Sequence, residues 1–298
     1  MMRVLVGVDG EGSFWQVVEY VKRLAFDQVE IDLVRVVESI LPDKSTPELP
    51  ADHPLASYYR MQAKSAQEML DAAQAALAKD GIPARTFLYY GDAAREIVSH
   101  ADRESCDLIT VRSSSKGKWG SLFFGSVSKG VLIGSNKSTL IVKAPPPPTD
   151  KLTAVLATDH SPYFNRCLEI LVAIAPKGIG RMIAMTSTAP AKLVHALLGK
   201  TSGLGDLTAA TMDEEAANNA LCEKLREKFP NCYSVIKEND PAEAIAETMK
   251  EASADLLIMG AQGHGYFERL RLGSQSFHQV VNTPHNVLIL RLPSEKGS

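Results

Sequence analysis

The chain has 298 residues, of which 45% are hydrophobic and 22% are charged, and its formal net charge is -3 at pH 7. This length suits about two domains, each large enough to build a core without disulfide or metal support. The mild acidity argues against a dedicated nucleic-acid-binding protein, which normally has a strongly basic face.

The first half of the chain alternates short apolar, β-branched segments with longer helical ones. We expect helices at residues 62–78, a stretch rich in Ala, Gln and Leu, and at residues 93–102. The expected strands lie at residues 4–8, 31–37, 85–89, 108–111 and 140–142. Continuous apolar strands separated by helices are typical of an α/β fold, in which helices cover both faces of a parallel sheet.

A proline-rich linker at residues 145–150 precedes a second half with the same alternation. Its four consecutive prolines, Pro145 to Pro148, favour a semi-rigid spacer. Residues 190–213 form an additional apolar segment, which we expect to be a helical excursion packed on its own domain. The expected strands of this half lie at residues 155–158, 182–185, 234–236, 256–259 and 287–290.

Four sequence blocks recur in the two halves. VLVGVD at residues 4–9 matches AVLATD at residues 154–159, an offset of 150. The other three pairs have an offset of 148: DLITV with DLLIM, the dipeptide GS with a second GS, and TLIVK with VLILR. Such agreement indicates a duplication, with one domain at residues 1–144 and the other at residues 151–298.

The loop after the fourth strand of the second half reads GAQGHGYFERLRLGSQS. Two residues separate Gly260 from Gly263, and nine separate Gly263 from Gly273. Glycines let backbone N–H groups approach phosphate oxygens closely. Gly273 and Ser274 begin the next expected helix, whose N-terminus attracts anions, and Ser276 adds a hydroxyl donor. The pattern predicts an anion site at the carboxyl end of a parallel strand.

The pattern Gly-x2-Gly-x9-Gly-Ser resembles the ATP loop of the universal stress protein family. Asp159 at the end of a first strand, Ser161 close behind it and an apolar last strand that includes Val287 agree with this resemblance. The resemblance covers nearly the whole chain, once in each half. It implies two tandem doubly wound, open parallel sheets of five strands, Rossmann-like or flavodoxin-like with strand order 3-2-1-4-5, flanked by helices.

The resemblance also implies how the second half would bind ATP. Asp159 would meet the ribose or the adenine, and the backbone around Ala157, Thr158 and Met185 would line the base. His264 would either approach the phosphates or lie in solvent, and Mg²⁺ could bridge the phosphates. Gln275 is expected at the nucleotide without a specified role, and the residues expected to hold the phosphates are Gly260, Gly263, Gly273, Ser274 and Ser276.

The first half departs from this pattern at two positions. Arg112 stands in the place of Gly260, and Ser115 stands in the place of Gly263. Two interpretations stay open: the first site has only a structural role, or Arg112 with Lys116 and Lys118 holds another anion. The residues that remain for a weaker first site are Asp9, Gly125, Ser126 and Ser128.

The sequence predicts no catalytic residue. Gly199-Lys200-Thr201 resembles the end of a P-loop, but Val194 stands where that motif needs a glycine. We therefore expect an ATP-binding stress-response or signalling protein in which nucleotide in the second domain modulates interactions. The alternatives are a nucleotide-independent interaction scaffold and a slow Mg²⁺-dependent ATP hydrolase.

The cysteines and histidines lack the spacing of a metal site. The seven histidines show neither HxxxH nor HxH. We expect separate thiols and no metal held by protein side chains. The four cysteines, widely separated and without a CxxC pair, are Cys106, Cys167, Cys222 and Cys232.

Location and partners complete the expectations. Met1 to Val8 is too short an apolar run for a signal peptide, and no run reaches the ~20 residues of a membrane helix, so we expect a cytoplasmic protein. Members of the family commonly pair domains through their last strands, which would bring residues 140–142 near 287–290. A homodimer of the tandem chain and an unidentified protein partner are further expectations, without nucleic-acid or membrane partners.

Overall fold

The computed structural model describes residues 1–38, 55–113, 125–188, 204–262 and 273–292. The chain divides into two compact units, of which the first consists mainly of Met1–Lys22 and Phe26–Pro145 and the second of Pro146–Leu290. The division falls between Pro145 and Pro146, inside the run of prolines.

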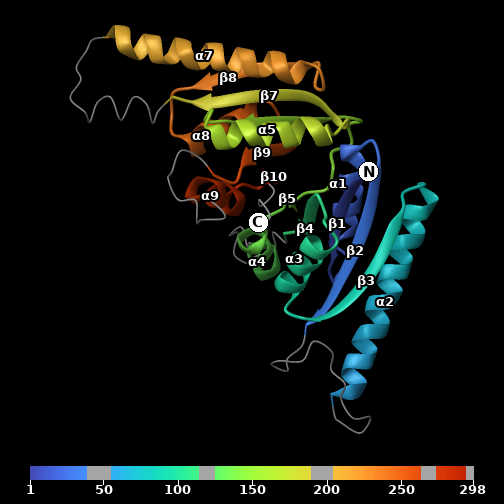
Figure 1. The fold of residues 1–298 in the computed structure, drawn as a ribbon. Helices are drawn as coiled ribbons and strands as arrows, with labels where there is room; N and C mark the ends of the chain where they lie inside the picture. The colour runs from blue at the N-terminus through green and yellow to red at the C-terminus, as the bar shows by residue number, and fades with distance from the viewer. Residues whose placement is uncertain (39–54, 114–124, 189–203, 263–272, 293–298) are drawn as a thin grey trace, which may run out of the picture. The chain divides into compact units, whose positions relative to one another are not determined.

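The first unit is an open parallel sheet with helices on both faces (Figure 1). Its strand order is β3-β2-β1-β4-β5, and the neighbouring strands pair in parallel. The elements are β1 (Met2–Val8), α1 (Trp15–Leu24), β2 (Val29–Glu38), α2 (Ala56–Lys79), β3 (Ala84–Gly91), α3 (Ala93–Arg103), β4 (Leu108–Arg112), α4 (Ser126–Gly134) and β5 (Ser138–Val142).

The second unit repeats this arrangement with strand order β8-β7-β6-β9-β10, again parallel. Both units therefore confirm the predicted order 3-2-1-4-5. The elements are β6 (Leu152–Ala157), α5 (Pro162–Ile174), β7 (Ile179–Ser187), α7 (Leu204–Arg226), β8 (Cys232–Lys237), α8 (Pro241–Glu251), β9 (Leu256–Gly260), α9 (Ser274–Asn282) and β10 (Asn286–Leu290).

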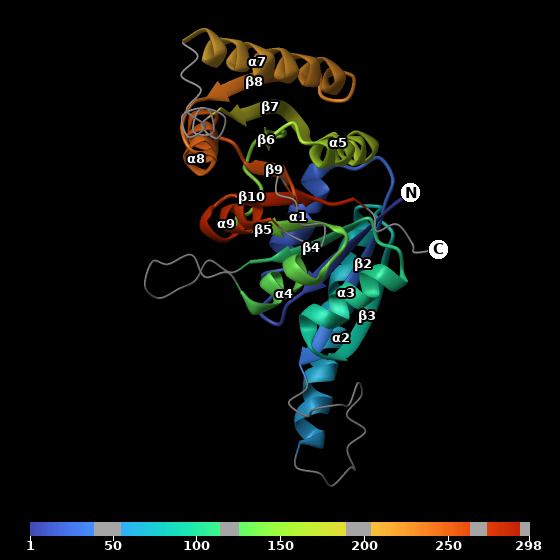
Figure 2. The ribbon, with the colours of Figure 1, turned by 60° about the vertical axis from the view of Figure 1, so that its left-hand side comes forward.

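The chain reverses direction across each sheet, and this reversal positions the candidate sites. Because crossovers between parallel strands are right-handed, α1 and α2 cover one face of the first sheet and α3 and α4 cover the other. In the views of Figures 1 and 2, α3 and α4 lie side by side. The carboxyl ends of β1 and β4 flank the reversal, as do those of β6 and β9, and ligands of such sheets bind there.

Matched hydrogen bonds show the duplication in atomic detail. Oδ2 of Asp107 accepts a hydrogen bond from the backbone N–H of Arg3 at 2.8 Å, which holds the start of β4 against β1. Oδ2 of Asp255 accepts the corresponding bond from Thr153 at 2.8 Å, between β9 and β6. The repeated sequence blocks therefore also repeat their contacts.

All ten expected strands are present in the described part of the chain, with ends shifted by a few residues. β6 ends at Ala157, so Thr158 lies just beyond the strand. Helix α2 begins at Ala56, ahead of the expected residue 62. Of the expected excursion at residues 190–213, residues 190–203 lie outside the described residues, and the rest belongs to α7. Among the described helices, none is both long and apolar enough to span a membrane.

Candidate functional site

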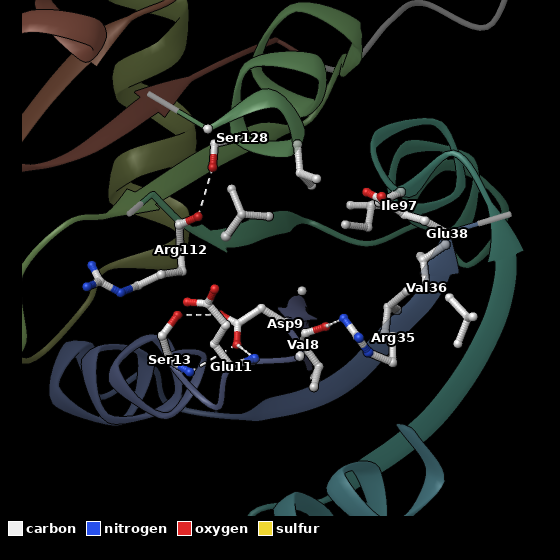
Figure 3. Close-up of a pocket in the computed structure, with 18 of the residues that line it drawn as sticks. Val8, Asp9, Glu11, Ser13, Arg35, Val36, Glu38, Ile97, Arg112 and Ser128 are labelled. Atoms are coloured by element: carbon white, nitrogen blue, oxygen red, sulfur yellow. Dashed lines mark hydrogen bonds between the residues drawn. The ribbon is translucent and has the colours of Figure 1, made fainter. Parts of the chain in front are cut away.

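The carboxylate of Asp9 fixes the turn that follows β1. Its Oδ1 accepts hydrogen bonds from the backbone N–H groups of Glu11 at 3.1 Å and Ser13 at 3.0 Å. The hydroxyl of Ser13 donates to Oδ2 of the same carboxylate (Figure 3). Three hydrogen-bond donors therefore hold the carboxylate of Asp9 in place directly after the carboxyl end of β1.

A pocket of about 440 Å³ opens at the carboxyl ends of β1, β2 and β4, beside the N-terminus of α4. Both apolar side chains, among them Val36 and Ile97, and the charged side chains of Arg35 and Glu38 line it, and all four lie on the same side of the pocket (Figure 3). Gly125 is the N-cap residue of α4. The pocket brings together the four residues expected in the first half: Asp9, Gly125, Ser126 and Ser128.

Arg35 is a pocket residue that the sequence analysis missed. Its Nη1 donates to the carbonyl oxygen of Val8 at 3.2 Å, and its buried Nε has no partner among the described residues. Burial lowers the pKa of Arg35, although the carboxylates of Asp9 and Glu38 act in the opposite direction. The guanidinium lies against Gly10, where a Cβ would be 2.8 Å from Nη2. The available signal was one basic residue within the otherwise apolar stretch of residues 33–37.

Arg112 directs its guanidinium toward the backbone at the end of β5. Its Nη1 donates to the carbonyl oxygen of Lys143 at 2.7 Å and lies 3.4 Å from that of Val142. Figure 3 shows this group pointing away from Arg35 and Ile97. Burial lowers the pKa of Arg112. The other loop residues considered for an anion, Ser115, Lys116 and Lys118, lie outside the described residues.

One serine in each unit ties the N-terminus of a helix to the end of a strand. The hydroxyl of Ser128 donates to the carbonyl oxygen of Arg112 at 2.8 Å. The hydroxyl of Ser276 donates to that of Gly260, also at 2.8 Å. Both serines are buried. Their hydroxyl protons are thus engaged by the backbone at the position where the sequence suggested phosphate donors.

The turn after β6 brings together the residues expected at the base and the ribose. Ala157 is the register partner of Met185, and the N–H of Thr158 donates to the carbonyl oxygen of Met185 at 2.9 Å. Oδ1 of Asp159 accepts from the N–H of Ser161 at 3.0 Å. Ser161 in turn caps α5 by accepting from the N–H of Phe164. The same short segment therefore ends the strand, presents Asp159 and starts the helix.

The two ends of the glycine loop meet beside this turn. The N–H of Gly273, the N-cap residue of α9, donates to the carbonyl oxygen of Ala261 at 2.7 Å. A Cβ on Gly260 would lie 3.3 Å from the carbonyl oxygen of Gln262 and 3.4 Å from the ring of Phe164, so the site favours glycine. Ser274 and Gln275 open α9, whereas Gly263 and His264 lie outside the described residues.

A buried polar cluster next to Asp159 also escaped the sequence analysis. Nε2 of His160 lies 2.9 Å from Oδ1 of Asn218, a fully buried residue of α7. The hydroxyl of Thr186 donates to the same oxygen at 2.9 Å. The strand registers give Thr186 and Arg35 corresponding positions in the two units. Because His160 and Asn218 are 58 residues apart, no local pattern could have predicted their contact.

Asp32, His100 and Cys106 form a second buried cluster, away from the pocket. Their donor atoms lie within 4.8 Å of one another, and by type they could hold a metal ion. Nε2 of His100 lies 3.0 Å from Asp32, and Arg85 donates to both carboxylate oxygens at 2.9 and 2.8 Å. Tyr89 lies 2.9 Å from Nδ1 of His100. A cation would have to displace Arg85, so we interpret the cluster as a hydrogen-bonded part of the core.

Hydrogen bonding and burial set the charges in this cluster. Burial alone would raise the pKa of Asp32, but the hydrogen bonds from His100 and Arg85 outweigh it, and the pKa is lowered. Burial raises the pKa of the Cys106 thiol to about 12, and the carboxylate of Asp32 adds to the effect. The cluster therefore holds an ionised carboxylate beside a neutral thiol at neutral pH.

Fold and site together define a tandem pair of doubly wound α/β domains, each with an Asp-bearing turn and a helix N-terminus at its switch point. The model of the universal stress protein family matches residues 1–143 and, a second time, residues 153–291. The chain belongs to the universal stress protein family, as the resemblance in its sequence predicted.

Known proteins agree with this assignment. A relative from Thermus aquaticus, named "Universal stress protein in QAH/OAS sulfhydrylase 3'region", is 31% identical over 147 residues, covering 47% of this chain and 98% of the relative. The crystal structure of a universal stress protein from Archaeoglobus fulgidus DSM 4304 has a TM-score of 0.67 at 23% identity, covering 97% of this chain and 98% of that one. A putative universal stress protein from Pseudomonas aeruginosa UCBPP-PA14 has a TM-score of 0.59 at 13% identity, covering 98% and 93%. These structures share the fold.

Proposed function

We propose that the second unit binds ATP and that nucleotide occupancy modulates the interactions of this universal stress protein. The closure of the glycine loop carries the proposal: the bond from Gly273 to Ala261 joins the two ends of the loop at 2.7 Å. The loop thus begins and ends at the switch point, next to Asp159. An anion held by the loop would lie over the N-terminus of α9, where helix N–H groups and the helix dipole favour negative charge.

The neighbouring turn supports a nucleotide rather than a simple anion. Asp159 follows the adjacent strand, and the hydrogen bond from Thr158 to Met185 aligns the ends of β6 and β7. This edge could take the base and the ribose while the loop takes the phosphates. Binding would favour those conformations of the surrounding surface that hold nucleotide best, and this population shift is how occupancy would alter an interaction.

The contrast between the two units supports one working site. Gly260 in the second unit corresponds to Arg112 in the first, where the side chain contacts the backbone of β5. The first unit forms its fourth strand, β4, and the following helix, α4, with Arg at this position. We therefore propose that the first pocket lacks the phosphate cradle.

The test is the nucleotide content and ATP affinity of Gly260→Arg, which gives the second unit the residue found in the first. Wild type should release about one ATP per chain on denaturation or bind it with Mg²⁺, and the variant should lose it. Arg112→Gly is the matched control and should leave this stoichiometry unchanged. Circular dichroism would verify that both variants fold.

Two outcomes would contradict the proposal. Wild-type protein that contains no nucleotide and binds none with added ATP and Mg²⁺ would favour the nucleotide-independent scaffold. Binding that survives in Gly260→Arg and disappears in Arg112→Gly would move the site to the first unit.

A further inference from the structure

Two of the four cysteines lie in direct contact in the second unit. The Sγ atoms of Cys222 on α7 and Cys232 at the start of β8 are 3.3 Å apart, and both residues are buried. A disulfide bond brings two sulfurs to about 2.05 Å. The two side chains already touch, and a bond between them would shorten the distance between the sulfurs by about 1.3 Å.

Other contacts hold α7 and β8 in the register that this bond would need. The hydroxyl of Ser234 donates to Oδ1 of Asn219 at 2.9 Å. On the other side of the sulfurs, Nε of Arg226 donates to the carbonyl oxygen of Cys232 at 3.2 Å. These polar contacts join α7 to β8 on both sides of the two sulfurs and hold the cysteines next to each other.

We propose that Cys222 and Cys232 are a redox-modification site that forms a reversible disulfide when the protein meets a hydroperoxide. One thiol attacks the peroxide, the O–O bond breaks, and a sulfenic acid and an alcohol or water form. The second thiol then displaces water from the sulfenic acid, and the S–S bond closes. Two sulfurs are oxidised, the two peroxide oxygens are reduced, and a dithiol reductant reverses the change by exchange.

The position of the pair sets how it reacts. Burial, reinforced by contact with Cys222, raises the pKa of Cys232, so the resting Cys232 thiol is protonated and slow to react. β8 is the outer strand in the order of its sheet, and α7 packs against it. Elements at a sheet edge open locally more easily than central ones, and such opening would admit a small peroxide.

The other two cysteines provide internal controls. Sγ of Cys106 donates to Asp32 at 3.8 Å in the first unit, and Sγ of Cys167 donates to the carbonyl oxygen of Leu290 at 3.7 Å. Both are buried, as the proposed pair is. Their sulfur atoms contact oxygen atoms, whereas those of Cys222 and Cys232 contact each other. Cys106 and Cys167 therefore test whether disulfide formation depends on contact between sulfurs rather than on burial.

The experiment treats the native full-length chain with hydrogen peroxide, quenches it, denatures it and counts thiols while mapping peptides by mass spectrometry. We expect two of the four thiols to disappear, one peptide pair linking Cys222 to Cys232, and four thiols again after dithiothreitol. Cys106→Ser combined with Cys167→Ser should form the same link. Cys222→Ser and Cys222→Ala should each leave Cys232 unlinked.

Three results would overturn the proposal. They are four thiols that survive peroxide, links that join different chains or other cysteines, and loss of Cys222 and Cys232 to sulfonic acids without a disulfide. Wild-type protein decides each of these results, so poor folding of a variant would not obscure them. Nucleotide binding has no part in the readout, and the outcome is independent of the proposed function.

Discussion

Single residues in this protein are often determined by contacts that lie far apart in the sequence. Asp9 and Asp159 could be found from the repeated blocks because each directly follows an apolar strand. The neighbours that complete their surroundings could not. Arg35 reaches the first pocket from the adjacent strand, and His160 contacts Asn218 on a helix 58 residues away. Sequence patterns give the position of a side chain along an element, whereas these contacts depend on how elements pack.

The carboxylate of Asp32 should make stability depend on pH. Its side chain is fully buried and its pKa is lowered, so its contribution is complete above the unfolded-state pKa of ~3.9 and is lost as pH falls through the lower folded value. Asp32→Asn should cost about 3 kcal/mol near neutral pH, because His100 and Arg85 lose an ionised partner. Urea unfolding between about pH 2 and pH 6 measures this.

The comparison needs a carboxylate at the surface. Asp71 is exposed on α2, where it accepts a hydrogen bond from Gln67. Asp71→Asn should change stability by less than about 0.5 kcal/mol and keep the acid dependence of wild type. If Asp32→Asn loses stability on acidification as steeply as wild type does, the assigned role of Asp32 is wrong.

At the scale of elements, the strands could be predicted and the contacts of the helices could not. Strands of a parallel sheet with both faces covered are continuous apolar runs, so β4, β5, β9 and β10 were recognisable from composition alone. The contact of α7 with the turn after β6 depends on Asn218, a polar residue without a distinctive local pattern. In contrast, a local helix signal recurs in both halves: Asp92 is the N-cap of α3, and Asp240, 148 residues later, is the N-cap of α8.

Asn218 should therefore matter more than its neighbour on α7. Asn218→Ala leaves His160 and Thr186 without their buried acceptor, and we expect a loss of about 1–3 kcal/mol in unfolding free energy. Asn219 is exposed and its Oδ1 accepts a hydrogen bond from Ser234 on the edge strand, so Asn219→Ala should cost less than about 1 kcal/mol. Denaturant unfolding of both variants measures the difference. Equal losses of unfolding free energy would show that the hydrogen bonds of Asn218 with His160 and Thr186 contribute no more to stability than other contacts of α7.

For the whole molecule, duplication was the feature that the sequence revealed most clearly. Two family matches and two sheets of the same strand order confirm it. The difference between the halves was visible at Arg112, but its consequence was not, because the sequence could not show that the guanidinium turns toward the end of β5. The sequence left two interpretations of the first site open, a purely structural role and the binding of another anion. The first half has a pocket at this place.

Transplanting residues between the halves tests this difference. Arg35→Thr, Arg112→Gly and Ser115→Gly together give the first unit the residues found at the corresponding positions of the second. If the second unit binds ATP as proposed, this triple variant should bind about two ATP per chain, because both loops then have the same glycines. Arg35→Thr alone should stay at one. Equilibrium dialysis gives the stoichiometry, and a triple variant that folds yet binds only one would show that other residues of the first pocket exclude nucleotide.

The pairing of Arg112 with Gly260 at equivalent positions has a consequence for how such a protein can diversify. An assembly of identical single-domain subunits receives every substitution in all its copies at once, and its symmetry keeps the copies alike. Here the two versions are encoded in one open reading frame, so they are always made in a ratio of one to one. One copy can change its chemistry while the other preserves the inherited one, and the cell needs no second gene to keep the unlike pair together.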